Sequence, residues 1–177
     1  MRIISGKFKK KSIYPPKNFN ARPTTDVAKE SLFNILDNHI DFEDMHVLDL
    51  YAGTGSISYE FASRGGRLVI AVDINPKCIS YINETATRLG FKNMKAIRSS
   101  SITFLDHCKE KFNIIFADPP YDLEGIEEVI KRVYRNDLLR EDGWLIIEHS
   151  PGKDFSAFDG FYQHRNYGKV NFSFFRK

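Results

Sequence analysis

HVLDLYAGTGS, residues 46–56, is a short apolar run followed at once by two closely spaced glycines. The run is typical of a buried strand, and the glycines indicate a tight turn. Amphipathic stretches separate it from further runs that also end in a small or polar residue. This alternation predicts an α/β fold with a mostly parallel central sheet. The further runs are RLVIAVD (67–73), NMKAIRSS (93–100), FNIIFADPP (112–120) and GWLIIEHS (143–150).

Helical patterns occupy three stretches between and before these runs. In RPTTDVAKESLFNIL (22–36) a threonine cap and Asp26 precede an apolar stripe. A second helix is predicted to start at Asn75–Pro76 and to stop at Gly90. A third is predicted from Gly125 or Ile126. The residues expected to face the core are Ala28, Leu32, Ile35 and Leu36, then Ile79, Ile82, Ala86 and Leu89, then Val129, Ile130 and Val133.

The two ends of the chain differ from this pattern. Apolar and polar residues alternate over 170–174, which is typical of a strand with one wet face. Residues 162–166 are expected to pair with it through a turn at Gly168. RIISGKFKKKSIYPP (2–16) contains short strand-like pieces rich in lysine. We therefore predict an antiparallel C-terminal strand pair and a small basic N-terminal β-hairpin arm.

The net charge of +3 is unevenly distributed. Residues 1–17 carry six basic side chains and no acid, so the other 160 residues have a net charge of −3. Such a patch on a mildly acidic body favours a docking surface for a polyanion. A solvated terminus without a ligand explains the charge equally well. The six basic residues are Arg2, Lys7, Lys9, Lys10, Lys11 and Lys17.

The composition argues against a membrane or secreted protein. No apolar run has the length of a membrane span, and no apolar region follows the charged start MRIISGKFKKK. We expect a cytoplasmic protein with no membrane partner. The two cysteines, Cys78 and Cys108, are expected to be reduced, and no spacing of cysteine or histidine predicts a metal site.

Candidate site residues stand where the first two strands end. In an open α/β sheet, ligands bind at the carboxyl ends of the strands. Asp49, Gly53 and Gly55 surround the first turn, and Asp73 follows 18 residues beyond Gly55, where nucleoside-binding folds place a carboxylate for ribose hydroxyls. For the glycine loop taken alone, a tight turn without a ligand is the alternative.

The details of the loop favour one kind of nucleoside cofactor. A dinucleotide site needs a third glycine where this chain has Ser58, and Asp49 would repel a pyrophosphate. A cationic ligand such as S-adenosylmethionine suits that carboxylate. We therefore predict S-adenosylmethionine as the cofactor in place of a nicotinamide.

ADPPYD (117–122) ends the fourth run. An exocyclic amine of a nucleobase is a poor nucleophile because its lone pair is delocalised, and Asp118 with the Pro119 carbonyl can accept its two hydrogens. Pro120 completes a rigid turn that preorganises these acceptors, and Tyr121 can stack on an extruded base. We predict catalytic roles for all four residues. The alternative is a structural Asp-Pro turn beside a surface tyrosine.

Together the glycine loop, Asp73 and the D-P-P-Y tetrapeptide resemble the Rossmann-like S-adenosylmethionine-dependent methyltransferases that act on amino groups of nucleobases. RIISGKFKKKSI and RPTTDVAKESLFNIL are similar to the RsmD-type family, 16S ribosomal RNA (guanine-N2)-methyltransferases. The resemblance implies an RNA-docking arm at residues 1–20 and a methyltransferase domain at residues 21–177, without a metal. It also implies a ribosomal RNA substrate, which we expect within an assembling small subunit, and we expect a monomer.

Site residues are carried over from this resemblance one by one. Relatives often bind the adenine amino group through an acid where this chain has Ser100, so we expect Ser100 or a backbone group there. Glu148 resembles a position near the substrate, with a strand-end structural acid as the alternative. The cofactor residues implied are Asp49, Tyr51, Gly53, Gly55, Asp73 and Ser100. The residues implied at the RNA substrate are Arg2, Lys7, Lys9, Lys10, Lys11, Arg22 and Thr24.

Three other functions remain open from the sequence. The D-P-P-Y motif equally suits adenine-N6 methylation of DNA or RNA. A non-catalytic RNA-binding module for ribosome assembly can keep the same fold. A nicotinamide-dependent dehydrogenase is disfavoured by Ser58 and Asp49.

Overall fold

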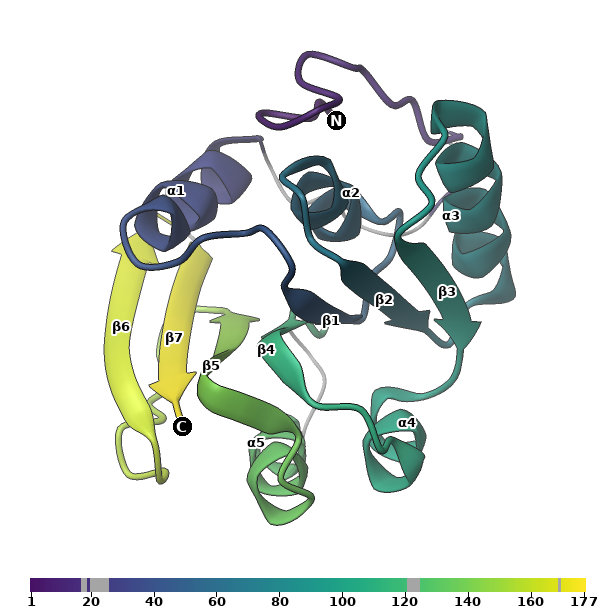
Figure 1. Ribbon diagram of the computed structural model, residues 1–177. Helices are drawn as coiled ribbons and strands as arrows, with labels where there is room; N and C mark the ends of the chain where they lie inside the picture. Colours follow the sequence, from purple (N-terminus) through teal and green to yellow (C-terminus); the bar gives the residue numbers. More distant parts are fainter. Residues whose placement is uncertain (17–18, 20–25, 121–124, 169) are drawn as a thin grey trace.

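The computed structural model of the chain describes residues 1–16, 19, 26–120, 125–168 and 170–177. They form a seven-stranded sheet in the order β3-β2-β1-β4-β5-β7-β6 (Figure 1). The first five strands are parallel, as the run-and-helix alternation predicted. The strands are β1 His46–Leu50, β2 Leu68–Asp73, β3 Met94–Arg98, β4 Phe112–Ala117, β5 Leu139–His149, β6 Phe161–Tyr167 and β7 Val170–Arg176.

Helices cover both faces of this sheet. One apolar core lies between the sheet and α1, α2 and α3, and a second lies between the sheet and α4 and α5. None of the helices in the described part of the chain is long and apolar enough to cross a membrane. The helices are α1 Asp26–Asp37, α2 Ser56–Ser63, α3 Pro76–Leu89, α4 Ser101–His107 and α5 Ile126–Arg135.

The predicted signals of α3 are confirmed by its ends. The Asn75 side chain accepts a hydrogen bond of 3.0 Å from the Lys77 backbone N–H, and Pro76 takes the first helical position. Gly90 closes the helix in the left-handed conformation, with φ of 77°. Local capping chemistry alone was therefore enough to place this helix.

The C-terminal strand pair is antiparallel as predicted, but the wet face predicted for it is wrong. Strand β7 lies between β5 and β6, and its side chains enter both apolar cores, Phe172 and Phe174 the first and Phe175 the second. Asn171 and Ser173 are buried, and the Ser173 hydroxyl lies 2.9 Å from Nε2 of His149. The polar residues of this strand therefore pair with neighbouring strands instead of water. The exposed strand of the pair is β6.

The β-hairpin predicted at the N-terminus is not shown, because residues 1–16, called the arm below, hold no regular strand. The described arm contains a single isolated antiparallel bridge, between Arg2 and Ser12. Backbone hydrogen bonds of 3.0 Å, from the Ile3 N–H to the Lys11 carbonyl and from the Ile13 N–H to the Met1 carbonyl, flank this bridge. The segment between them turns at Gly6 and Lys10, whose φ values are 77° and 70°. The boundary predicted after residue 20 falls outside the described residues and stays a prediction.

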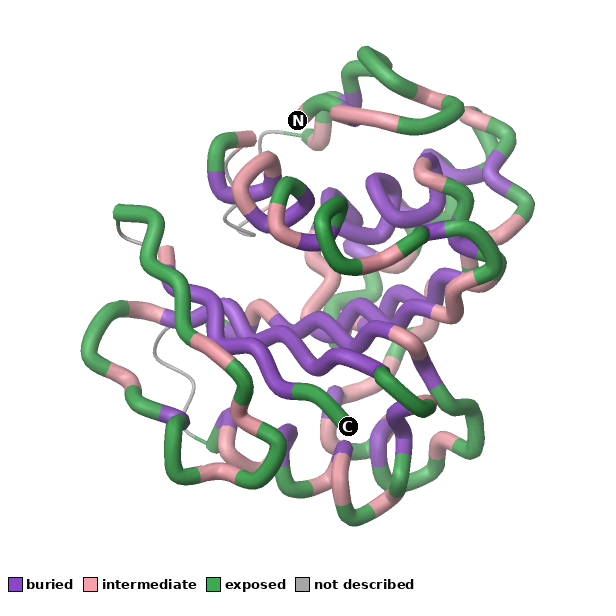
Figure 2. The backbone as a smooth tube through the Cα atoms, turned by 60° about the vertical axis from the view of Figure 1, so that its left-hand side comes forward, coloured by how far each residue is buried: buried purple, intermediate pink, exposed green. Residues whose placement is uncertain are grey.

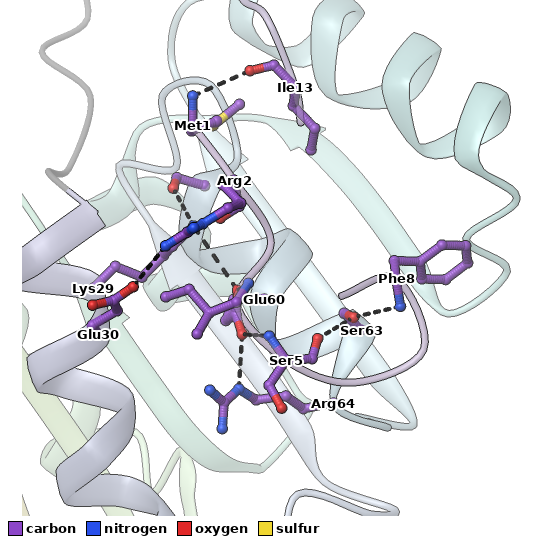
Figure 3. A network of polar contacts seen from close by, with 12 residues as sticks. Met1, Arg2, Ser5, Phe8, Ile13, Lys29, Glu30, Glu60, Ser63 and Arg64 are labelled. Atoms are coloured by element: carbon purple, nitrogen blue, oxygen red, sulfur yellow. Dashed lines mark hydrogen bonds and ion pairs between the residues drawn. The ribbon is translucent and has the colours of Figure 1, made fainter. Parts of the chain in front are cut away.

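The arm nevertheless packs as part of the main core. Ile3 and Ile13 are each only 2% exposed and belong to the same apolar cluster as α1 and α2. A Cβ atom on Gly6 would lie 1.9 Å from the Ser63 carbonyl oxygen, so only glycine permits this close approach. The hydroxyl of Ser63 donates to the Ser5 carbonyl over 2.6 Å. Figure 3 shows the arm lying against α2 at these contacts.

Glu60 of α2 holds the arm through its carboxylate (Figure 3). It is fully buried and accepts the backbone N–H groups of Ile4, at 2.8 Å, and Ser5, at 2.9 Å. The Nε atom of Arg64 donates to it over 2.9 Å. Lys29 of α1, also buried, places its Nζ atom 3.9 Å from Glu60. One buried carboxylate therefore joins α1, α2 and the arm.

Lys29 completes this connection from the α1 side. Its ammonium donates to the Arg2 carbonyl oxygen at 2.6 Å and to the Ser56 hydroxyl at 3.3 Å. Burial lowers the pKa of Lys29, and the neighbouring Glu60 carboxylate opposes that shift. A buried pair of this kind adds little net stability, but removal of one partner leaves an uncompensated charge.

We predict that Glu60→Gln lowers the free energy of unfolding by about 3 kcal/mol, because Lys29 then loses its buried counter-charge. Urea unfolding measures this change. Hydrogen exchange should show faster exchange at the Ile4 and Ser5 amides. Glu30→Gln is the matched control, because Glu30 and Arg2 are both exposed and should contribute less than about 1 kcal/mol. Equal effects of the two substitutions would contradict the anchoring role of Glu60.

Candidate functional site

The register of three strands brings the predicted site residues to one edge of the sheet. Leu50, the last residue of β1, pairs with Val72 on one side and with Ala117 on the other. Asp73 and Asp118 each follow directly after those partners. They therefore stand on either side of the chain that leaves β1, one strand spacing of about 4.8 Å away on each side. The predicted convergence of strand ends is present in the structure.

The glycine loop after β1 is held by Asp73. One carboxylate oxygen of Asp73 accepts the Gly53 N–H at 2.8 Å, and the other accepts the Asn75 N–H at 2.7 Å. Each carboxylate oxygen has a second lone pair, so the same group can still accept bonds from ribose hydroxyls. Tyr51, in the same turn, has a positive φ of 62°. Asp73 thus fixes the loop in the conformation that a cofactor would meet.

Gly55 is required by packing as well as by any ligand. A Cβ atom there would lie 2.9 Å from the ring of Tyr59 and 3.0 Å from Ile82. Its φ of 82° also belongs to the left-handed region. The glycine therefore allows α2 to start close against α3. Its presence alone does not identify a cofactor site.

Asp49 is the buried carboxyl group of the site. It is 2% exposed, and the Ser58 hydroxyl of α2 donates a hydrogen bond to it. Burial raises the pKa of Asp49 to about 7, while the Ser58 hydrogen bond opposes the shift and the charges of Asp118 and Asp73 add to it. In the sequence, Ser58 is notable only as the residue that replaces the third glycine of a dinucleotide site. The structure gives it a direct role as the partner of Asp49.

The electrostatics of this edge suit a cation. Three carboxyl groups converge, and the charges of Asp118 and Asp73 add to the burial that raises the pKa of Asp49. A further negative group there would be unfavourable. A ligand with an ammonium and a sulfonium, as in S-adenosylmethionine, would relieve that repulsion, whereas a pyrophosphate would increase it. Among the described residues, no group of three histidine, cysteine or acidic side chains could hold a metal ion.

Ser100 is committed to the start of α4. Its hydroxyl oxygen accepts the Thr103 backbone N–H at 3.1 Å, and the hydroxyl donates to the Thr103 side chain at 2.7 Å. This is a helix cap, which explains a serine at this position without a ligand. A contact between Ser100 and an adenine ring stays a prediction.

The D-P-P-Y segment is described only in part. Asp118 is half-buried, and its backbone N–H reaches the Leu50 carbonyl at 3.5 Å. Pro119 is buried and Pro120 is exposed. The segment therefore crosses from the core to the surface immediately after β4. The remaining predicted substrate residues, Tyr121, Arg22 and Thr24, lie outside the described residues.

The basic residues of the arm are exposed, but they lie at some distance from the glycine loop. Lys29 joins the Arg2 carbonyl to Ser56 at the first turn of α2, whereas the Lys7 N–H bonds the Ser63 carbonyl at its last turn, over 2.7 Å. A helix of eight residues is about 12 Å long. The lysine-rich part of the arm therefore lies toward the end of α2 remote from the loop.

The charges of the arm divide into two groups. Arg2 forms an ion pair of 2.9 Å with Glu30. Within the described residues, no carboxylate forms an ion pair with any of the four lysines, which leaves their charges available to a polyanion. These lysines are Lys7, Lys9, Lys10 and Lys11, all exposed.

The chain is similar to several known proteins. The family model described as Conserved hypothetical protein 95 matches residues 1–176. The "Ribosomal RNA small subunit methyltransferase D" of Escherichia coli (strain K12) is 30% identical over 148 residues, which are 84% of this chain and 71% of that protein. The protein of the same name from Buchnera aphidicola (subsp. Baizongia pistaciae) is also 30% identical, over 84% of this chain and 75% of its own length.

A solved structure extends this similarity to the whole fold. The protein yhhF from Escherichia coli superposes with a TM-score of 0.87 at 25% sequence identity. The superposition covers 100% of this chain and 97% of yhhF. The arm and the antiparallel end of the sheet are therefore included in the shared structure.

We predict that Asp49→Asn stabilises the free protein at pH 8 by about 1 to 3 kcal/mol. With a folded-state pKa of about 7, the folded protein keeps a proton that the unfolded chain loses near pH 4, so stability falls as pH rises between these values. In Asp49→Asn this decrease of stability with pH should be absent. Urea unfolding of both proteins from pH 5 to pH 8 measures the free energy of unfolding that decides this.

The same group should make cofactor binding pH-dependent. Calorimetry should show wild-type affinity for S-adenosylmethionine rising from pH 6 to pH 8 as Asp49 ionises, and a large loss of affinity in Asp49→Asn. Asp44→Asn is the matched control, because Asp44 has an 85% exposed side chain. Wild-type affinity that stays constant over this pH range would contradict the assignment.

Proposed function

Because the chain belongs to the family of Conserved hypothetical protein 95, the RsmD-like S-adenosylmethionine-dependent methyltransferases, we propose that it methylates the exocyclic 2-amino group of a guanine in small-subunit (16S) ribosomal RNA. The observation that carries this proposal is the position of Asp118. It follows β4 directly and lies at the edge of the sheet that also holds Asp49 and Asp73. An acceptor for the substrate amine therefore stands beside a site suited to a cationic cofactor.

The proposed cofactor site consists of Asp49, the glycine turn after β1 and Asp73. Asp49 supplies negative charge to the methionine part, the turn at Gly53 and Gly55 approaches it through backbone, and Asp73 accepts the ribose hydroxyls. When bound, S-adenosylmethionine supplies an electrophilic methyl group. The remaining chemistry is positioning, which this chain's own residues provide.

The substrate amine is positioned by Asp118 and Pro119. The carboxylate and the Pro119 carbonyl each accept one N–H of the amine, which favours a pyramidal nitrogen with its lone pair directed at the methyl group. The proton is lost after methyl transfer, when the nitrogen is cationic, so no histidine base is required. Tyr121 would stack on the guanine, a contact worth about 1–3 kcal/mol for bases on aromatic rings. Arg22 and Thr24 would lie beside the pocket.

The proposed RNA contacts begin at the arm. The four lysines without described ion pairs give it a charge that complements phosphate. Because they lie toward the far end of α2, an RNA bound to them would have to run along that helix to reach Asp118. A structured RNA of that extent fits an assembling small subunit better than a short free oligonucleotide.

We predict that nucleoside mass spectrometry of ribosomal RNA from cells lacking the protein shows the loss of one N2-methylguanine. Purified wild type with S-adenosylmethionine should restore it, and Asp118→Ala should restore less than about 1% in the same time, because it lacks an acceptor that aims the amine. Asp44→Asn serves as the active control. The appearance of N6-methyladenine would identify the adenine enzyme, and unchanged RNA would contradict ribosomal RNA methylation.

We predict that replacing Lys9, Lys10 and Lys11 together with alanine weakens RNA binding and reduces its salt dependence. Each lost phosphate contact should lower the slope of log K against log salt by about 0.7 to 0.9. Filter binding with unmodified small-subunit RNA at four salt concentrations measures this. The control replaces Lys92, Lys95 and Lys109, which are exposed outside the arm. An unchanged slope would mean that the arm is only solvated.

A further inference from the structure

The chain has a second basic region that its net charge conceals. Residues 161–177 contain four lysine or arginine residues and no acid. The intervening residues 18–160 contain 16 basic and 23 acidic side chains, a net charge of −7. Positive charge is therefore concentrated at both ends of the chain, and not in the arm alone.

Two of these four charges are paired with carboxylates within the described structure. Arg176 pairs with Asp142 at 3.2 Å, and Lys177 pairs with Asp137. Arg165 differs, because no carboxylate of the described residues forms an ion pair with it, and its Nε atom donates only to the Gln163 side chain, at 3.1 Å. Arg165 is therefore a surface charge without a described counter-charge.

The strand register places Arg165 level with the proposed catalytic residue. Ala117 pairs with Ile147 of β5, so Asp118 is followed across the sheet by Glu148. Glu148 pairs with Phe172 of β7, and Phe172 pairs with Arg165 of β6. One row of the sheet therefore runs from Asp118 to Arg165, over three strand spacings or about 14 Å.

Arg165 also lies on the same face of the sheet as the cofactor loop. Paired residues of neighbouring strands point to the same face, and Phe172 belongs to the core on the side of α1, α2 and α3. Asp49 points to that side as well, where it meets Ser58 of α2. The positive charge and the proposed reaction centre thus share both an edge and a face.

Tyr167 adds an aromatic surface beside this charge. It lies two residues beyond Arg165 in the same strand, so both side chains are on the same face. It remains 36% exposed although its ring contacts Phe172 edge-on, with a centroid distance of 6.2 Å. Figure 2 shows this end of β6, up to Gly168, as exposed chain that projects from the body.

We propose that Arg165 and Tyr167 form a second RNA contact, which holds the single-stranded nucleotides next to the methylated guanine. The guanidinium binds a phosphate, and the Tyr167 ring stacks on an unpaired base. Proteins bind single-stranded RNA through cationic and aromatic side chains, and this exposed strand presents one of each with no acid between them. This inference rests on the proposed function, since it requires an RNA substrate at Asp118.

The test uses the full chain and unmodified small-subunit ribosomal RNA made by transcription. The variants are Arg165→Glu, Arg165→Ala and Tyr167→Ala. The controls are Arg67→Glu, an exposed arginine directly before β2 at the amino ends of the parallel strands, and Tyr162→Ala, an exposed tyrosine at the start of β6. Filter binding gives the RNA affinity at several salt concentrations, calorimetry gives cofactor affinity, and light scattering gives the oligomeric state.

We expect Arg165→Glu to weaken RNA binding at least about tenfold, and Arg165→Ala to lower the salt slope by about one contact. Tyr167→Ala should weaken binding by about fivefold or more. S-adenosylmethionine affinity and melting temperature should stay unchanged, as they should in both controls.

The second RNA contact and the ribosomal RNA substrate would be refuted by different outcomes. RNA affinity unchanged in Arg165→Glu and Tyr167→Ala, with RNA bound tightly by the wild type, would refute the second contact and leave the proposed function intact. A wild type that binds S-adenosylmethionine but not this RNA would refute the ribosomal substrate itself. A wild-type dimer broken by the β6 variants would mean that the strand edge binds a second copy of the chain instead.

Discussion

The site depends on the parallel register of β1 with β2 and β4. This register places Asp73 and Asp118 on the two sides of the chain leaving β1, above the buried carboxyl of Asp49. The three groups repel one another. The pKa of Asp49 is raised to about 7, mainly because burial removes water from the carboxyl group and further because Asp118 and Asp73 are negatively charged. The free protein therefore keeps an electrostatically unfavourable arrangement that a cationic cofactor would relieve.

The elements with local signals could be predicted from the sequence. Asn75, Pro76 and Gly90 bound α3 because capping involves only neighbouring residues. The predictions that failed depend on distant neighbours. Whether Ser173 meets water depends on the residues that pack on its side chain, among them His149 of β5, and a period-2 pattern cannot show which residues these will be. The arm has one antiparallel bridge, and it is hydrogen-bonded to Glu60 and Ser63 of α2, partners that the sequence of the arm does not reveal.

The site residues near the carboxyl ends of the strands could be predicted from the sequence, whereas their partners on the helices could not. Asp73 and Asp118 each end or directly follow a recognisable apolar run, and Asp49 is the next-to-last residue of the first run. Ser58 and Glu60 belong to a helix buried on every side, so no polar face separated them from core residues. Lys29 did leave a signal, because it falls on the apolar stripe of α1 beside Leu32 and Phe33. A charge in such a position indicates a buried partner.

The strand order also constrains how the chain folds while it is being made. Strand β7 is inserted between β5 and β6, so the open side of β5 stays without its hydrogen-bonding partner until residues 170–176 have left the ribosome. The arm leaves the ribosome first, but Lys29 and Glu60, which hold it by hydrogen bonds, are made tens of residues later. A growing chain therefore exposes an apolar strand edge, the kind of surface that invites aggregation and chaperone binding. A chain with this strand order would therefore benefit from protection during its own synthesis.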